Sequence, residues 1–150
     1  MSSFERGVMY LNAIDFYRVG RWLKKHKIPV LPLLVDLVIF LVFNSKVPLE
    51  CEIGEGTYCG HRGIAIVIHP EAVIGKRCEL GSCVTVGGGG KGKPGAPVIG
   101  DDVVISTGAK VLGAVRIGNG VTIGANAVVI HDIPDGATAV GVPAKIISRA

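Results

Sequence analysis

The chain has 150 residues, the size of a single domain, and its 22 glycines and 5% aromatic content suit short extended segments that turn often. Its net charge of +4 lies entirely in residues 1–46, which hold seven Lys or Arg against three acids, whereas residues 47–150 hold nine of each. A basic excess confined to one segment favours an anionic lipid surface over a nucleic acid, and no basic groove with interleaved aromatics follows, so we expect no nucleic-acid partner.

Residues 10–27 predict an amphipathic helix whose apolar face is formed by Leu11, Ile14, Val19, Trp22 and Leu23. Residues 28–43 are almost wholly apolar but contain two prolines and Asp36. As a helix they would span about 24 Å, short of the roughly 30 Å hydrocarbon core of a bilayer, so we expect no transmembrane span. The favoured interpretation is a helix buried against the coil or a neighbouring subunit; the alternative is a helix in a membrane interface.

An aliphatic residue recurs every six positions in the second half of the chain, at Ile99, Ile105, Val111, Ile117, Ile123 and Val129. A small or branched residue follows four positions after the first five of these, at Val103, Ala109, Val115, Val121 and Ala127. The same phase runs earlier through Ile68, Ile74, Leu80 and Val86. A period of six fits neither an α-helix nor an alternating strand, but it is typical of a parallel β-helix with stacked aliphatic residues inside. We predict an all-β domain over residues 47–150, preceded by a short N-terminal helical extension, residues 1–46.

Two breaks interrupt the repeat. After Val86 the next aliphatic member of the series is Ile99, where the period alone would place it at position 92, so about seven residues loop out in the segment GGGGKGKPGAP. The units before Ile68 are offset by half a period, which places the second break at residues 60–65. This second break carries His61.

The four cysteines form no CxxC pair and follow no signal peptide, so they predict neither a zinc site nor a disulfide framework. Cys59 and Cys78 fall on interior repeat positions, where we expect core packing. We expect a reducing cytoplasm, with peripheral contact at the inner face of the membrane through residues 10–43 as a further hypothesis.

Three segments are more specific than the repeat: GHRGIAIVIHPEAVIG, CVTVGGGGKGKPGAPVIGDDVVISTGAKVLG and IPDGATAVGVPAKII, at residues 60–75, 83–113 and 133–147. With them the chain resembles, over about residues 10–150, the serine O-acetyltransferase branch of the hexapeptide-repeat acyltransferases, in particular its short members of capsule and exopolysaccharide synthesis. The resemblance implies a left-handed parallel β-helix, a homotrimer with active sites between subunits, and acetyl-CoA as co-substrate without a metal.

His61 aligns with the histidine that serves this family as general base. An alcohol is a poor nucleophile, and an imidazole can accept its proton as it attacks a thioester. The resemblance therefore implies direct acetyl transfer with His61 as the catalytic residue. The other histidines, His26, His69 and His131, are assigned to structure.

The resemblance also implies a CoA groove along successive coils. Exposed backbone amides in a glycine-rich loop, with ammonium groups nearby, suit phosphates, although a merely flexible turn has the same composition. The implied cofactor-binding residues are Gly87, Gly88, Gly89, Gly90, Lys91, Lys93, Gly108, Ala109, Lys110, Gly124, Ala125 and Lys145.

The chain departs from the family pattern at the amino-acid pocket. The family places an aspartate directly before the catalytic histidine, where this chain has Gly60, and another in a preceding D-I-H-P stretch, replaced here by residues 46–49. A histidine of the insertion loop is replaced by residues 95–97. These losses favour a sugar hydroxyl, on a small molecule or a lipid-linked acceptor of polysaccharide synthesis, over free L-serine. Candidates for an acid that orients His61 are, by proximity in sequence alone, Glu50, Glu52 and Glu55.

Three alternatives stay open. One is a serine O-acetyltransferase whose missing contacts come from another subunit. A second is a structural trimer that binds CoA without turnover, favoured by the missing orienting aspartate. The third is a metal-dependent hydratase of the same fold, which needs three histidines around the metal; His61 and His69 lack a third partner in the repeats, so we expect no metal site.

Overall fold

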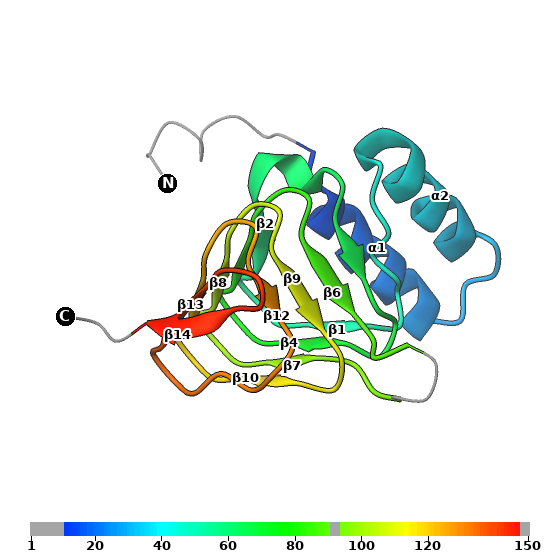
Figure 1. Ribbon diagram of the computed structural model, residues 1–150. Helices are drawn as coiled ribbons and strands as arrows, with labels where there is room; N and C mark the ends of the chain where they lie inside the picture. Colours follow the sequence, from blue (N-terminus) through cyan, green and yellow to red (C-terminus); the bar gives the residue numbers. More distant parts are fainter. Residues whose placement is uncertain (1–10, 91–93, 148–150) are drawn as a thin grey trace.

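The computed structural model describes residues 11–90 and 94–147, which form two helices followed by a stack of short strands (Figure 1). The helices are α1 (Ala13–Lys25) and α2 (Leu31–Phe43), and a 3-10 element, η1 (Gly60–Gly63), interrupts the strands. The strands are β1 (Glu52–Ile53), β2 (Tyr58–Cys59), β3 (Val67–Ile68), β4 (Val73–Ile74), β5 (Glu79–Leu80), β6 (Thr85–Gly87), β7 (Val98–Ile99), β8 (Val104–Ile105), β9 (Lys110–Leu112), β10 (Arg116–Ile117), β11 (Thr122–Ile123), β12 (Val128–Val129), β13 (Thr138–Val140) and β14 (Lys145–Ile147).

The strands form the three faces of a parallel coil. The sheets have the orders β1-β4-β7-β10, β14-β13-β11-β8-β5-β2 and β12-β9-β6-β3, and every pair is parallel except β13 with β14. Val98 pairs with Arg116 and Val104 with Thr122, in each case the matching position of the third repeat unit further along, so one turn of the coil holds three units. The predicted parallel β-helix is confirmed.

The aliphatic repeat positions form the interior of the coil. All of those predicted from Ile68 to Val129 are buried, with exposed fractions of at most 3%. Complete burial of one such side chain stabilises a fold by roughly 1.5–3 kcal/mol. Cys59 and Cys78 lie in the same core, as predicted, and burial raises the pKa of the Cys59 thiol to about 12. These thiols therefore stay protonated and pack as small apolar groups.

Both breaks appear in the strand register. Val73 pairs with Val98, whereas a regular turn would bring it beside position 91, so the predicted insertion lies within this turn. Glu52 pairs with Val73, whereas a regular turn would bring it beside position 70. The extra residues of this earlier turn lie around η1, so the segment that carries His61 bulges from the coil.

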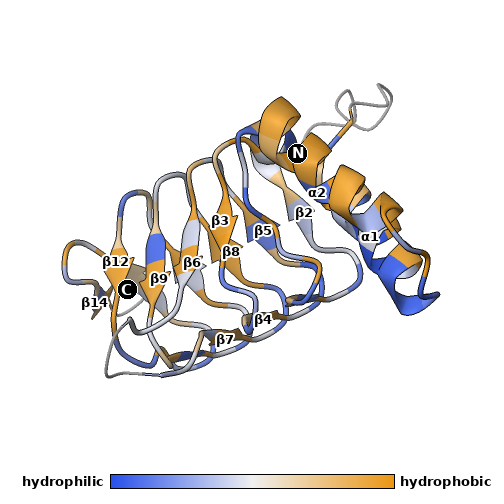
Figure 2. Ribbon diagram, turned by 90° about the vertical axis from the view of Figure 1, so that its right-hand side faces the viewer, coloured by the Kyte–Doolittle hydropathy of each residue, from blue (hydrophilic) through white to orange (hydrophobic). Residues whose placement is uncertain are grey.

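Helix α1 covers the end of the coil where the first repeats lie (Figure 2). It buries Ala13, Ile14, Tyr17 and Gly20, and the Tyr17 hydroxyl donates a hydrogen bond of 2.6 Å to the Cys51 carbonyl. The predicted apolar face is wrong for Leu11, Val19 and Trp22, which are exposed. The side of α1 that carries Tyr17 lies against the coil, although another side is more apolar, because the Tyr17 hydroxyl has a hydrogen-bond acceptor there.

Helix α2 packs against the rest of the chain through one narrow edge. Only Ile39 and Phe43 of its 13 residues are buried, so the expectation of a helix buried against the coil is wrong for most of α2. Among the described residues, no helix is long and apolar enough to cross a membrane. The first strand contact of the coil is made by Lys46, which forms a parallel bridge to Val67. The boundary that we propose between the helical segment, residues 1–46, and the coil lies directly after this residue.

The buried threonine Thr57 offers a test of this packing. Its hydroxyl donates to the Gly75 carbonyl at 2.7 Å and accepts from the Cys78 amide at 3.0 Å. Thr57→Val keeps the shape but leaves both backbone groups without this partner, so we expect a loss of about 1–3 kcal/mol in the free energy of unfolding, measured by urea denaturation. Thr107→Val, at an exposed turn position, is the control and should change stability little.

Candidate active site

His61 lies on a strained turn that faces solvent. His61 and Arg62 have φ values of 48° and 65°, in the left-handed region that non-glycine residues rarely adopt. Each such residue costs about 1–2 kcal/mol, so the surrounding contacts must hold the turn in place. The imidazole of His61 is exposed on this turn.

Asn12 holds the turn from the side of α1. Its Oδ1 accepts from the Ile14 amide at 3.2 Å and so caps the helix, while its Nδ2 donates to the Cys59 carbonyl at 2.8 Å. Gly63, with φ +80°, closes the turn where a Cβ atom would lie 2.8 Å from the Cβ of Ala13. A side chain at residue 63 would therefore push the turn away from α1.

Ser45 holds the other side of the same turn. It is buried, its Oγ lies 2.6 Å from the Gly63 carbonyl, and it accepts from the Ile66 amide at 2.9 Å. Asn12 and Ser45 are positioning residues that the sequence analysis missed. An asparagine before a helix is an N-cap signal that predicts part of the role of Asn12, whereas nothing in the sequence indicates the role of Ser45.

The ring of His61 makes no hydrogen bond or ion pair with the described residues. Of the three acids considered as orienting groups, Glu50 is paired with Lys24, whose hydrogen bond lowers the pKa of Glu50. Glu52 and Glu55 are exposed, and neither contacts His61. The three glutamates are thus paired or exposed surface carboxylates with no bond to His61 within the described residues, and they stay candidates by proximity in sequence alone.

Four turns stack at one corner of the coil, between the six-stranded sheet and the sheet that contains β3. Backbone hydrogen bonds link each turn to the next: Cys83 N to Ile64 O, Gly108 N to Ser82 O and Asn126 N to Thr107 O, at 2.9–3.1 Å. The first of these turns contains His61, the third contains Gly108 and Ala109, and the fourth contains Gly124 and Ala125. The fold thus brings five of the predicted site residues into one row.

Not every member of this row presents its side chain to solvent. The Ala109 side chain is fully buried, its amide donates to Ser106 O and its carbonyl accepts from Thr85 N. Ala109 is therefore a core residue, and its side chain can make no ligand contact. Lys110, the next residue, is exposed and donates to the Gly108 carbonyl at 3.0 Å.

The glycine run begins at the other end of β6. Gly89 N donates to Gly95 O at 3.1 Å and closes the base of the insertion loop, while Gly90 is exposed with φ 72°. A Cβ atom at Gly88 would lie 2.9 Å from the ring of His69, so His69 packs directly under this loop. Its Nδ1 accepts from the Glu71 amide at 3.2 Å. His69 therefore has the structural role assigned to it.

The remaining predicted positions are spread around the coil. Gly87 ends β6 and pairs with Leu112, and Lys145 is exposed on β14, the edge strand of the six-stranded sheet. Lys91 and Lys93 lie outside the described residues. The structure thus brings the four turns together at one corner of the coil. Lys145 and the glycine run lie on two different faces of the same chain.

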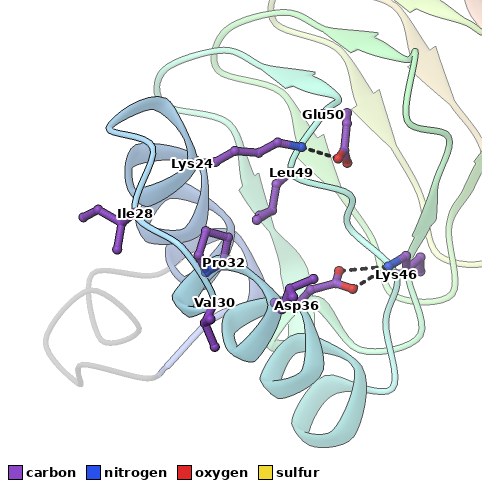
Figure 3. Close-up of a pocket in the computed structure, with 9 residues that line it drawn as sticks. Lys24, Ile28, Val30, Pro32, Asp36, Lys46, Leu49 and Glu50 are labelled. Carbon is purple, nitrogen blue, oxygen red and sulfur yellow. Dashed lines mark hydrogen bonds and ion pairs between the residues drawn. The ribbon is translucent and has the colours of Figure 1, made fainter.

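A groove of about 330 Å³ lies elsewhere, between the α1–α2 connection and the start of the coil (Figure 3). It is lined by Lys24, near the end of α1, whereas the His61 turn contacts Asn12 at the beginning of α1. The part of α1 between Asn12 and Lys24 is about 18 Å long, and it separates the groove from the His61 turn. The groove is therefore not part of the His61 site, which lies on an open surface of the chain.

Comparison with known proteins supports the fold and the family. The profile of bacterial transferase hexapeptide (six repeats) matches residues 96–131. A serine acetyltransferase of Synechococcus elongatus is 37% identical over 140 residues, which cover 92% of this chain and 57% of that protein. The serine acetyltransferase of Helicobacter pylori is 36% identical over 93% of this chain and 81% of its own length. The chain belongs to the serine acetyltransferase family.

The structural similarity agrees. A solved serine acetyltransferase in complex with CoA superposes with a TM-score of 0.82 and 33% identity, covering 93% of this chain and 58% of that one. The chain therefore spans little more than half the length of several members of the family. What is shared is the coil and the helical segment directly before it.

The contact from α1 to the His61 turn can be tested apart from any activity. Asn12→Asp keeps the oxygen that caps α1 but removes the donor to the Cys59 carbonyl. We expect faster amide hydrogen exchange in residues 60–66 with unchanged helix content, because opening of the turn costs less. Asp15→Asn, also in the first turn of α1, is the control; equal protection in all three proteins would contradict the role of Asn12.

Proposed function

We propose that the chain is an acetyl-CoA-dependent O-acetyltransferase in which His61 is the general base. The observation that carries the proposal is the position of His61 on an exposed, doubly anchored turn in the same row as Gly108, Gly124 and Ala125. Family membership supports the same chemistry. Acetyl-CoA is the proposed co-substrate, and the described residues contain no cluster of ligands that could hold a metal.

The geometry suits direct transfer. His61 takes the proton of the acceptor hydroxyl as its oxygen attacks the thioester carbonyl, and a tetrahedral intermediate forms. Collapse of this intermediate breaks the C–S bond, and the thiolate of CoA receives the proton that His61 holds. The anchors at Asn12 and Ser45 fix the backbone of the turn that carries His61, which lowers the entropic cost of bringing the imidazole to the acceptor hydroxyl.

L-serine is the first proposed acceptor, since the relatives and the solved structure described above are named serine acetyltransferases. The comparisons thus favour this acceptor over the sugar hydroxyl that we predicted from the sequence. The sugar stays a second candidate because of two observations: Gly60 replaces the aspartate expected before the histidine, and His61 has no acidic partner among the described residues. None of these relatives is named for a role in capsule or exopolysaccharide synthesis.

We also propose a homotrimer with active sites between subunits. The side chains of His61, Ile64 and Val67 are exposed on the surface of one chain. A neighbouring coil against this surface would exclude water, supply the missing partner of His61 and bring a second set of predicted CoA contacts to the site. The reducing cytoplasm is the proposed compartment, consistent with four free thiols.

The decisive experiment measures thiol release from acetyl-CoA with L-serine, free sugars and lipid-linked sugars as acceptors. We expect His61→Ala to lower kcat/KM by about 10²–10⁴-fold, the usual contribution of a general base. His131→Ala, which removes another exposed histidine, is the matched control. Serine-dependent release supports the first acceptor and sugar-dependent release the second. Equal rates in wild type and His61→Ala would exclude His61 as the base, and CoA binding without transfer to any acceptor would favour the structural trimer.

The role of Lys145 has its own test. We expect Lys145→Ala to raise the KM for acetyl-CoA by about tenfold, because a charge-assisted contact to a phosphate is lost. The KM for acetyl-pantetheine, which carries no phosphate, should stay the same. Lys76→Ala, at an exposed turn on a different corner, should alter neither value. A parallel rise for both substrates in Lys145→Ala would assign Lys145 to the fold instead.

A further inference from the structure

One face of α2 is apolar and uncovered. Six side chains on it are between 49% and 73% exposed: Leu33, Leu34, Leu37, Phe40, Leu41 and Val42. They follow one another at steps of one or three positions, so they share a broad side of the helix. Figure 2 shows α2 as a nearly continuous hydrophobic element at the end of the coil. A contiguous apolar patch of this kind on a surface marks an interaction site.

The surface beside this face is basic. The end of α1 and its connection to α2 hold Lys24, Lys25 and Lys27, and the whole net charge of +4 belongs to residues 1–46. Lys24 is paired with Glu50, and Lys46 with Asp36 at 2.6 Å, so the groove between them is neutral (Figure 3). Lys25 and Lys27 are exposed and make no ion pair with the described part of the chain. Lys25 and Lys27 therefore place positive charge without an ion-pair partner at the end of α1 and in the connection that leads into α2.

The apolar face of α2 and the basic residues near it together indicate which kind of surface could cover α2. A second copy meeting α2 in a two-fold contact would bring two basic clusters together, which opposes association, and the proposed trimer contact lies at His61, Ile64 and Val67 rather than on α2. A protein partner is ordinarily met by an apolar centre with a polar rim all round, whereas the exposed side of α2 is apolar along its whole length. A bilayer with anionic headgroups accepts the apolar side chains and attracts the lysines in one contact.

We propose that α2 lies in the surface of an anionic lipid bilayer, with Leu33, Leu37 and Leu41 in the acyl boundary and Lys25 and Lys27 at the headgroups. With 13 residues, α2 is about 20 Å long, which suits a helix lying in the plane of the interface. The coil then extends away from the membrane, since α2 lies at one end of it (Figure 2). The test measures lipid binding and not acetyl transfer, so its failure can be distinguished from failure of the proposed function.

The test is flotation of the whole protein with vesicles of phosphatidylcholine alone or mixed with phosphatidylglycerol. We expect flotation with the mixed vesicles only, and its loss in high salt, because surface attraction between charges is screened. Wild type thus provides a result that requires no variant. Failure to float with anionic vesicles at low salt would overturn the proposal.

Two variants separate the contributions of the two parts of the surface. The triple substitution Leu33→Ser, Leu37→Ser and Leu41→Ser removes the apolar face, and Lys25→Glu with Lys27→Glu reverses the free charge; each should lower the bound fraction by about tenfold or more. Matched controls on the coil are Ile130→Ser and Lys76→Glu, which should float like wild type. Unchanged flotation of both α2 variants would refute the assignment. A smaller assembly of the leucine variant in solution, with its vesicle binding intact, would also refute it, because another copy of the chain would then cover α2.

Discussion

The structure depends on the burial of one aliphatic side chain in every repeat unit. A three-sided coil has no second layer, so its interior is filled by these ladders, in which each member stacks on the member three units further along, and by the buried small or branched residues between them, such as Val103 and Ala109. The backbone groups of each turn bond to the turns before and after it. Register and burial therefore support one another, and a residue that leaves the period must leave the wall of the coil.

This constraint explains where the chemistry lies. The extra residues before Ile68 cannot be placed inside, so the segment that carries His61 projects from the surface, and the register shows a second insertion before Ile99. The first carries His61 within a run of three left-handed residues, whereas regular turns of the coil contain single ones such as Arg77 and Asn126. Strain of this kind persists only where neighbouring contacts over-determine it, here through Asn12 and Ser45. The coil supplies rigidity, and the first break in its repeat carries the proposed general base.

The two helices join the coil and the site. Helix α1 closes the apolar end of the coil and, through its capping residue, holds the turn of His61, so one asparagine serves stability and positioning at once. Helix α2 contributes Ile39 and Phe43 to the core but leaves most of its apolar surface outside. That surface is unfavourable for a chain alone in water, and the proposed bilayer contact offsets this cost.

The sequence by itself determined the coil, its period and both breaks, because a repeat of buried aliphatic side chains with a period of six is a local pattern that admits one architecture. It also predicted His61 as the catalytic residue, from the position of the second break and the family motif around it. Only the tertiary structure decided which face of α1 is buried, that α2 is largely exposed, that Ala109 belongs to the core, and that Asn12 and Ser45 hold the His61 turn. The roles of Asn12 and Ser45 depend on contacts between segments far apart in the chain, and hydrophobic periodicity carries no information about such pairs.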